Sequence, residues 1–300
     1  MTVQKLWAGR NFSISGRRRV VVRNKSVFTL SLLATLLILA SSSPAWSQCV
    51  TSTPSGKCGP YSDSSLSATY KTITQNDVWK PPSSWSQTLS TTNPGDWYIT
   101  ANFPADRSGA IHTYPSAAIN YYDGKAPTLD SYSYMYSSFS EVPDTSSTTV
   151  SDVGYDIWMN NWANEIMLQH QLINTPACTT FATHVVATNV SFGGSNGVPT
   201  QTWNLCQFGN EGSGSVELVW QITGPGGSKN FGVSSSSVDI YSMLKWLEGN
   251  AACYSSSGAG SVCLPVRSTF TQTAYGFEIS GTGGLSRQFM VKNWTQAASH

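Results

Sequence analysis

The stretch from Tyr155 to Leu172, YDIWMNNWANEIMLQHQL, constrains the fold of this chain more than any other segment, because two short apolar runs flank a polar turn. The runs are Tyr155 to Met159 and Glu165 to Leu168, and residues 160–164 lie between them. This spacing is typical of a β-hairpin. The segment therefore predicts two neighbouring antiparallel strands.

The hairpin is expected to display its polar residues in two rows, because side chains two residues apart share one face of a strand. The first row contains Asp156 and Trp158, and the row on the returning strand contains Glu165, Met167 and Gln169. A carboxylate is expensive to bury without partners. If the two rows meet, we therefore expect them to line a cleft rather than a sealed interior.

The rest of the chain favours one all-β unit with no internal repeat and no linker to a second domain. Charged residues make up only 11% of the 300 residues, and Gly, Ser, Thr and Asn separate short apolar runs. Strands are expected at residues 70–78, 97–103, 110–121, 131–136, 181–192, 201–208, 215–223, 268–280 and 285–294, and loops at 141–149 and 250–263. This pattern predicts two antiparallel sheets packed face to face, and a curved sheet would supply the groove.

One segment, residues 238–249, has helical spacing instead. Its apolar stripe consists of Ile240, Met243, Leu244 and Leu247. Asp239 stands near the expected start and Gly249 at the expected end, as helix termini favour. We expect this amphipathic helix to lie on a sheet.

The first 47 residues predict an export signal. They contain seven of the seventeen Lys and Arg and no Asp or Glu, and a basic stretch precedes the apolar run Val27 to Ala40, after which Ala45-Trp46-Ser47 offers a cleavage site. The run has about fourteen residues, fewer than the ~20 needed to span a bilayer, although a retained anchor stays an alternative. The expected domains are a signal at 1–47, a Ser/Gly-rich tail at 48–67 and a body at 68–300.

Removal of the signal leaves ten Lys and Arg against sixteen Asp and Glu, a net charge of −6. An acidic secreted protein without a basic patch is a poor candidate for nucleic-acid binding. We expect an extracellular monomer with no stable membrane partner.

All six cysteines follow the signal, and an even number in an exported chain implies disulfides. Sequence proximity favours the pairs 49 with 58, 178 with 206 and 253 with 263, although fifteen pairings are open. Metal ligation is the alternative, but the chain has no CxxC motif and its four His are scattered. We expect no cofactor.

Three glutamates lie inside apolar strand patterns: Glu165, Glu217 and Glu278. Glu217 is interpreted as outward-facing, because Val216, Leu218 and Trp220 would share the other face. Glu165 and Glu278 share their faces with small, amide or soft residues, which leaves space for a ligand. The other acids considered are expected in exposed loops or turns, namely Asp96, Asp106, Asp123, Asp130, Glu141, Asp144 and Glu211.

Two carboxyl groups that face each other across a groove are the catalytic groups of most glycoside hydrolases. At a separation of about 5–5.5 Å, one carboxylate acts as nucleophile and the other carboxyl as acid and then base. The two roles require different pKa values, and Asp156 beside Glu165 would tune one of them. Eleven Trp and thirteen Tyr include candidates for platforms that stack on sugar rings, although core packing is the favoured explanation for most of them.

Six motifs in order resemble glycoside hydrolase family 12. They are NDVW at 76–79, TYP at 113–115, YDIW at 155–158, NEIM at 164–167, the helix DIYSMLKWLEG, and YGFEISGTGG near the C-terminus. The resemblance covers roughly residues 68–295. It implies a β-jelly roll sandwich of two curved sheets that binds β-glucan polysaccharides and hydrolyses β-1,4-glucans internally with retention.

The resemblance also implies residue roles. Glu165 matches the nucleophile, Glu278 the acid/base and Asp156 the acid that assists the nucleophile, while Trp79 matches a sugar-stacking aromatic. Gln169 stands where the family commonly has an aromatic residue. Family 11 xylanases share the fold, but the nucleophile segment lacks their E-Y-Y pattern, so xylan is the less favoured substrate.

Two other classes of function remain open. One is a non-catalytic β-glucan-binding jelly roll, which the presence of both Glu165 and Glu278 disfavours. The other is a disulfide-braced structural protein whose aromatic residues all pack in the core, which leaves the acid pair unexplained.

Overall fold

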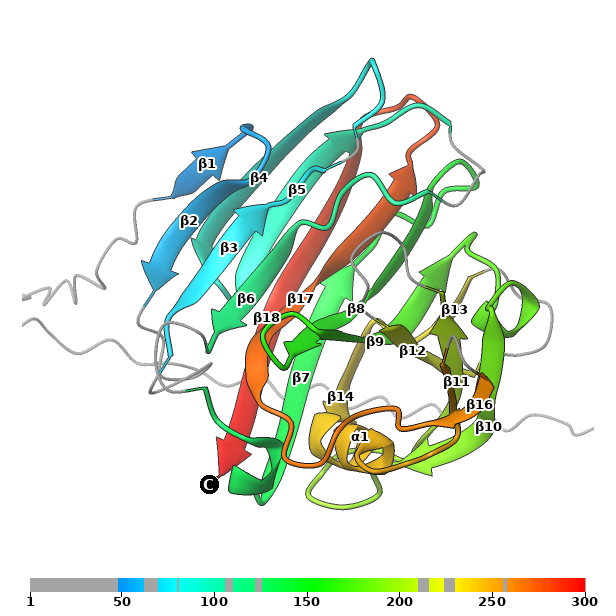
Figure 1. Ribbon diagram of the computed structural model, residues 1–300. Coiled ribbons are helices and arrows are strands. Elements are labelled where there is room, and N and C mark those ends of the chain that lie inside the picture. The colour runs from blue at the N-terminus through cyan, green and yellow to red at the C-terminus, as the bar shows by residue number, and fades with distance from the viewer. Residues whose placement is uncertain are drawn as a thin grey trace, which may run out of the picture. The chain divides into compact units, whose positions relative to one another are not determined.

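The computed structural model describes residues 48–61, 70–79, 81–105, 110–121, 126–209, 216–223, 230–255 and 258–299 (Figure 1). The expected signal at 1–47, the end of the expected tail at 62–67, and Asp106, Asp123 and Glu211 lie outside these ranges. Within the described ranges, none of the helices has the length and apolarity that a membrane span requires.

Most described strands belong to two sheets. The smaller sheet has the order β1-β4-β5-β18-β7-β14, with bounds Cys49–Thr51, Ser86–Asn93, Asp96–Asn102, Arg287–Ser299, Tyr134–Val142 and Ser235–Asp239. The larger sheet has the order β10-β11-β12-β9-β8-β17-β6-β3-β2, with bounds His184–Phe192, Gln201–Phe208, Val216–Ile222, Asn164–Ile173, Val150–Met159, Phe270–Gly281, Ser116–Asn120, Thr72–Asn76 and Gly56–Tyr61. Three short strands complete the set: β13 (Asn230–Gly232) pairs with β9, and β15 (Cys253–Ser255) pairs with β16 (Gly258–Ser261).

The core lies between the two sheets because one face of each sheet is apolar. From the larger sheet, side chains such as Tyr155, Ile157 and Leu168 are fully buried, and Trp97 and Phe289 from the smaller sheet join the same cluster. Burying a side chain of this size contributes roughly 1.5–3 kcal/mol. Alternate residues of the larger sheet face the other way, and we call that surface the polar face. It includes Asp152, Asp156, Trp158, Glu165, Met167, Gln169, Glu217, Gln221, Gln272 and Glu278.

The all-β sandwich predicted from the sequence is confirmed, with one difference in strand direction. The ladder between β9 and β12 is parallel, whereas the other ladders between named strands are antiparallel. β10 and β11 intervene in sequence between these two partners, so a local hairpin pattern does not predict this pairing.

The predicted helix is α1, Ile240–Leu247, the only α-helix among the described residues. The Asp239 carboxylate accepts a hydrogen bond from the Ser242 backbone N–H at 3.0 Å and so caps the first turn. The predicted apolar stripe, Ile240, Met243, Leu244 and Leu247, is buried. Gly249 has a φ of 70°, a conformation that favours glycine.

The expected N-terminal tail contributes strands instead. β1 pairs with β4 at the edge of the smaller sheet, and β2 pairs with β3 at the edge of the larger one. Composition pointed to a tail because this segment is rich in small residues, but the disulfide Cys49–Cys58 joins β1 to β2. The other two expected disulfides, Cys178–Cys206 and Cys253–Cys263, also form.

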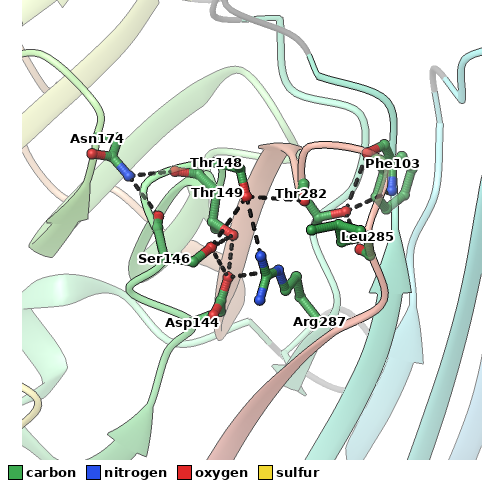
Figure 2. Close-up of polar contacts among 9 residues, drawn as sticks. All are labelled: Phe103, Asp144, Ser146, Thr148, Thr149, Asn174, Thr282, Leu285 and Arg287. Atoms are coloured by element: carbon green, nitrogen blue, oxygen red, sulfur yellow. Dashed lines mark hydrogen bonds and ion pairs between the residues drawn. The ribbon is translucent and has the colours of Figure 1, made fainter.

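A polar network joins the connections between strands at one end of the two sheets (Figure 2). Asp144, between β7 and β8, accepts hydrogen bonds from Ser146 and Thr149 and lies 3.5 Å from the Arg287 side chain of β18. Asn174, just after β9, donates to the backbone carbonyls of Ser146 and Thr149. The loop that links the smaller sheet to the larger one is therefore held to the ends of two further strands.

The strand predictions need three corrections, one of which is the loop expected at 250–263, where β15 and β16 pair antiparallel. β4 and β14 were not expected, because each Ser- and Thr-rich sequence contains a single apolar residue, Leu89 in β4 and Val238 in β14. Residues 141–149 were expected to form a loop with Glu141 exposed, but Glu141 lies in β7 with only 5% of its surface exposed.

Candidate active site

The predicted hairpin forms, and its two polar rows meet. β8 and β9 pair antiparallel, with Trp158 opposite Glu165 and Asp156 opposite Met167. The turn between the strands places Asn160, Asn161 and Trp162 at positive φ, a conformation that Asn tolerates well and Trp adopts rarely. The indole N–H of Trp158 donates to Asp156 Oδ2 at 2.9 Å, which fixes both side chains on the polar face.

Glu278 comes to the same face from β17. It lies directly opposite Asp152 on β8, and the next polar-face pair along the two strands is Gly276 with Gly154. A Cβ atom at Gly154 would lie 2.2 Å from the Leu168 carbonyl oxygen, and one at Gly276 would lie 2.2 Å from that of Pro115. These glycines leave bare backbone between the Glu278 pair and the Asp156 row, and the close approach of neighbouring strands requires them.

Two of the carboxyls on this face, Asp156 and Glu278, favour their protonated forms. Burial raises the pKa of Asp156 to about 7, although the Trp158 indole N–H opposes the shift and Glu217 adds to it. Burial likewise raises the pKa of Glu278 well above its usual range, and the charges of Asp152, Glu217 and Asp156 raise it further. The site therefore contains acids able to hold a proton near neutral pH.

Aromatic side chains surround these acids. Trp79 is 43% exposed and follows Val78, which bridges to Thr113 next to β17. At the hairpin turn, the rings of Trp158 and Trp162 lie 5.4 Å apart. Tyr114, which the sequence analysis did not single out as a site residue, is buried and its hydroxyl donates to the Gly154 carbonyl at 3.1 Å.

Glu217 belongs to the site as well, contrary to its interpretation as an ordinary outward-facing residue. Leu218 and Trp220 do face the core, but the opposite face is the one that carries the acids, and β12 places Glu217 beside Glu165. Phe208 pairs with Glu217 on this face, and its ring lies 5.4 Å from that of Phe181. Only the parallel pairing of β9 with β12 reveals this neighbourhood.

The remaining predicted residues, Met167 and Gln169, are buried at 4% and 8% exposure on the same face. The Gln169 amide nitrogen lies 3.5 Å from Glu278 Oε2, so the amide at this position contacts a carboxyl. Within the described ranges, no three His, Cys, Asp or Glu residues gather in a way that would hold a metal ion.

No protein-family model matches the sequence, and no curated protein is significantly similar to it. Solved structures match over most of the chain. One is the xyloglucanase domain of NopAA, a type three effector from Sinorhizobium fredii, in complex with cellobiose, with 23% identity, a TM-score of 0.62, and coverage of 84% of this chain and 99% of that one.

Two others are the native family 12 xyloglucanase from Bacillus licheniformis and the catalytic domain of Humicola grisea Cel12A in complex with a soaked thio cellotetraose. The first has 20% identity, a TM-score of 0.60, and coverage of 84% of this chain and 100% of that one. The second has 16% identity, a TM-score of 0.56, and coverage of 84% and 99%. At these identities the likeness establishes the fold, which is that of family 12 glycoside hydrolases, as the sequence resemblance predicted.

Proposed function

We propose that this protein is a secreted glycoside hydrolase that cleaves β-1,4-glucans internally with retention of configuration. The observation that carries the proposal is the polar face of the larger sheet, where Glu165, Glu278 and Asp156 lie on three adjacent strands among aromatic residues. The fold neighbours support the substrate class, because they include xyloglucanases and an endo-1,4-β-glucanase. The three disulfides, together with the export signal predicted from the sequence, support secretion.

In this proposal a glucan chain lies across the polar face and stacks on Trp79 and Trp158. Glu278 donates its proton to the glycosidic oxygen while the Glu165 carboxylate attacks C1, so that the C1–O bond breaks and a glycosyl-enzyme forms. Glu278, now ionised, takes a proton from a water molecule that attacks C1 and releases Glu165. Asp156 contributes a hydrogen-bonding and electrostatic partner next to the reacting carboxyls.

The raised pKa of Glu278 fits the acid role, because an acid must still hold its proton at the pH of the reaction. Met167 and Gln169 are proposed to contact the substrate on the polar face, where Met167 lies opposite Asp156 and Gln169 lies next to Glu278. The mechanism uses only carboxyls and water, and we propose no cofactor and a monomeric enzyme.

The test is reducing-sugar release from carboxymethyl-cellulose, barley glucan, xyloglucan and xylan by the purified protein, beside Glu165→Gln and Glu278→Gln. We expect release from at least one β-1,4-glucan and little from xylan, with loss of activity in both variants. The first-formed product should be the β-anomer, detected by NMR. An α-anomer, or near-normal turnover in Glu165→Gln, would refute the mechanism. Retention on a glucan affinity gel without hydrolysis would instead identify a binding protein.

A further inference from the structure

Asp152 is a buried carboxyl that the proposed mechanism does not use. It is 2% exposed and lies on β8 directly opposite Glu278, so the two carboxyls project from neighbouring positions of the polar face. Two ionised carboxylates in such contact repel strongly, and pairs of this kind share a proton. Glu278 and Asp152 are hydrogen-bonded to each other.

The amide of Gln169 completes the cluster. Its nitrogen carries two N–H groups, of which one points to Glu278 Oε2 at 3.5 Å, and Asp152 also accepts a hydrogen bond from the Gln169 side chain. Donors of this kind stabilise an ionised carboxylate. Gln169 therefore bridges the two carboxyls rather than contacting one of them alone.

The orientation of this amide is determined by a chain of hydrogen bonds that begins at a backbone group. The Cys178 backbone N–H donates to Gln221 Oε1 at 2.6 Å, and Gln221 Nε2 donates to Gln169 Oε1 at 2.8 Å. A backbone N–H can only donate, so Gln221 must present its oxygen to Cys178 and its nitrogen to Gln169. Gln169 must then present its nitrogen to the carboxyls. Cys178 is itself anchored by its disulfide to Cys206 on β11.

We infer that Asp152 and Gln169 are positioning residues for Glu278: the Asp152 carboxylate accepts a hydrogen bond from the protonated Glu278 carboxyl, and the Gln169 amide bridges both groups. This inference deepens the proposed function and rests on it for the role of Glu278. The proton resides on Glu278 before the reaction, passes to the leaving oxygen as the glycosidic bond breaks, and is replaced from water in the second step. The like charge of Asp152 favours that recapture.

The charged neighbours of Glu278 support this assignment of the proton. Asp152 and Asp156 on β8 and Glu217 on β12 are all acidic and all raise the pKa of Glu278, while burial is the largest cause. Tyr114, before β6, also faces these acids. Burial raises the pKa of Asp152 to about 7, but its hydrogen bonds with Glu278 and Gln169 favour the ionised form.

The experiment is a side-chain carboxyl ¹³C NMR titration of the full chain labelled at Asp and Glu, for the wild type, Asp152→Asn and Gln169→Met. In Asp152→Asn, we expect the Glu278 midpoint to fall by at least about one pH unit, a tenfold change in its protonation equilibrium. In Gln169→Met, the lower of the two midpoints of the pair should rise, because the bridging donor is gone. The alkaline limb of the kcat/KM profile should move with the Glu278 midpoint.

Gln207→Met is the matched control. Gln207 is a buried glutamine, 7% exposed, whose amide holds the Tyr254 backbone through two hydrogen bonds on the other face of the larger sheet. The Gln207→Met variant should lose about as much stability as Gln169→Met and leave the titration midpoints of Asp152 and Glu278 unchanged.

The readout separates the two proposals. A shifted midpoint in a protein without hydrolytic activity would sustain the carboxyl pair and overturn the proposed function. An unshifted Glu278 midpoint in Asp152→Asn, or equal effects of Gln169→Met and Gln207→Met on the titrations, would overturn the pair even in an active enzyme.

Discussion

Strand β17 presents Glu278 to the polar face and, three residues earlier, Tyr275 to the core, where the Tyr275 hydroxyl donates to Glu141. Glu278 therefore lies on one face of β17, and Glu141 contacts the other face of the same strand. Burial raises the pKa of both glutamates well above the usual range. Their neighbours differ. Glu278 faces other carboxyls, whereas the near neighbours of Glu141 are aromatic or neutral.

The core neighbour His170 is held neutral. Its Nδ1 donates to the Val233 carbonyl at 3.0 Å, its Nε2 lies 3.7 Å from Glu141, and its ring stacks on Phe139. Burial lowers the pKa of His170 to about 3. A buried carboxyl among neutral groups retains its proton, whereas one among carboxyls shares it and can transfer it to a bound ligand. The comparison teaches that neighbours, not burial alone, separate a chemical site from a structural one.

The largest expected effect is the loss of hydrolytic activity when an acid of the polar face is neutralised, in contrast to Glu141 on the core side. Glu165→Gln and Glu278→Gln should each reduce glucan hydrolysis by roughly 10³-fold or more, about 4 kcal/mol in the activation barrier. Glu141→Gln should leave activity within about threefold. Hydrolysis assays beside thermal unfolding test this difference, and a folded Glu141→Gln protein without activity would break the proposed separation of the two faces.

The pH dependence of stability should carry a contribution from Glu141. Below its usual pKa of 4.5 the carboxyl is protonated whether folded or unfolded, so its stabilising contribution is fully present. As the pH rises above 4.5, only the unfolded chain releases the proton, and stability falls by up to about 1.4 kcal/mol per pH unit until the folded carboxyl ionises too.

His170 acts in the opposite direction. Its lowered pKa gives a contribution to stability that is complete above pH 6.5 and is lost as the pH falls toward 3.

Urea unfolding between pH 4 and 8 measures the contribution of Glu141, because His170 is present in both proteins compared. The wild type should lose stability with rising pH relative to Glu141→Gln. Parallel curves for the two proteins would show that Glu141 ionises as readily in the fold as in the unfolded chain.

Sequence patterns predicted the features that depend on local periodicity. The hairpin of β8 and β9 follows from alternation around Asn160 and Asn161, and α1 follows from a 3.6-residue stripe that begins after Asp239. The rows of Asp156 and Glu165 could be placed on one face for the same reason. Such patterns specify which residues share a face, but they do not specify which face becomes the core.

The errors lie where the missing information is long-range. Glu217 was assigned to the correct side of its strand, yet its proximity to Glu165 depends on a parallel ladder between strands far apart in sequence. Glu141 was expected in solvent because its segment is polar, but its burial depends on contacts with Tyr275 and His170, which lie 134 residues away in one case. No local window contains either partner.

A moderate loss of stability is expected from Tyr275→Phe. The change removes the hydroxyl that donates to Glu141 and leaves a buried carboxyl without that donor, which costs about 1–3 kcal/mol. Tyr98→Phe on half-buried β5 should change the free energy of unfolding by less than about 0.5 kcal/mol. If both variants unfold alike, the hydroxyl contact does not stabilise the core.

The smallest expected effect is that of Trp79→Ala, and a tryptophan buried in the core provides the contrast. Trp79 is 43% exposed, and its proposed contact is the face of a sugar ring, so Trp79→Ala should raise KM by roughly fivefold, about 1 kcal/mol, with little change in stability. Trp97 is 2% exposed in the core, where its ring meets that of Phe277 edge-on at 5.6 Å. Trp97→Ala should therefore lower the free energy of unfolding by about 3–5 kcal/mol, whatever its activity. Steady-state kinetics and urea unfolding of both variants measure the contrast. An unchanged KM in Trp79→Ala would remove Trp79 from the glucan-binding face and leave substrate contacts to the aromatic residues around the hairpin turn.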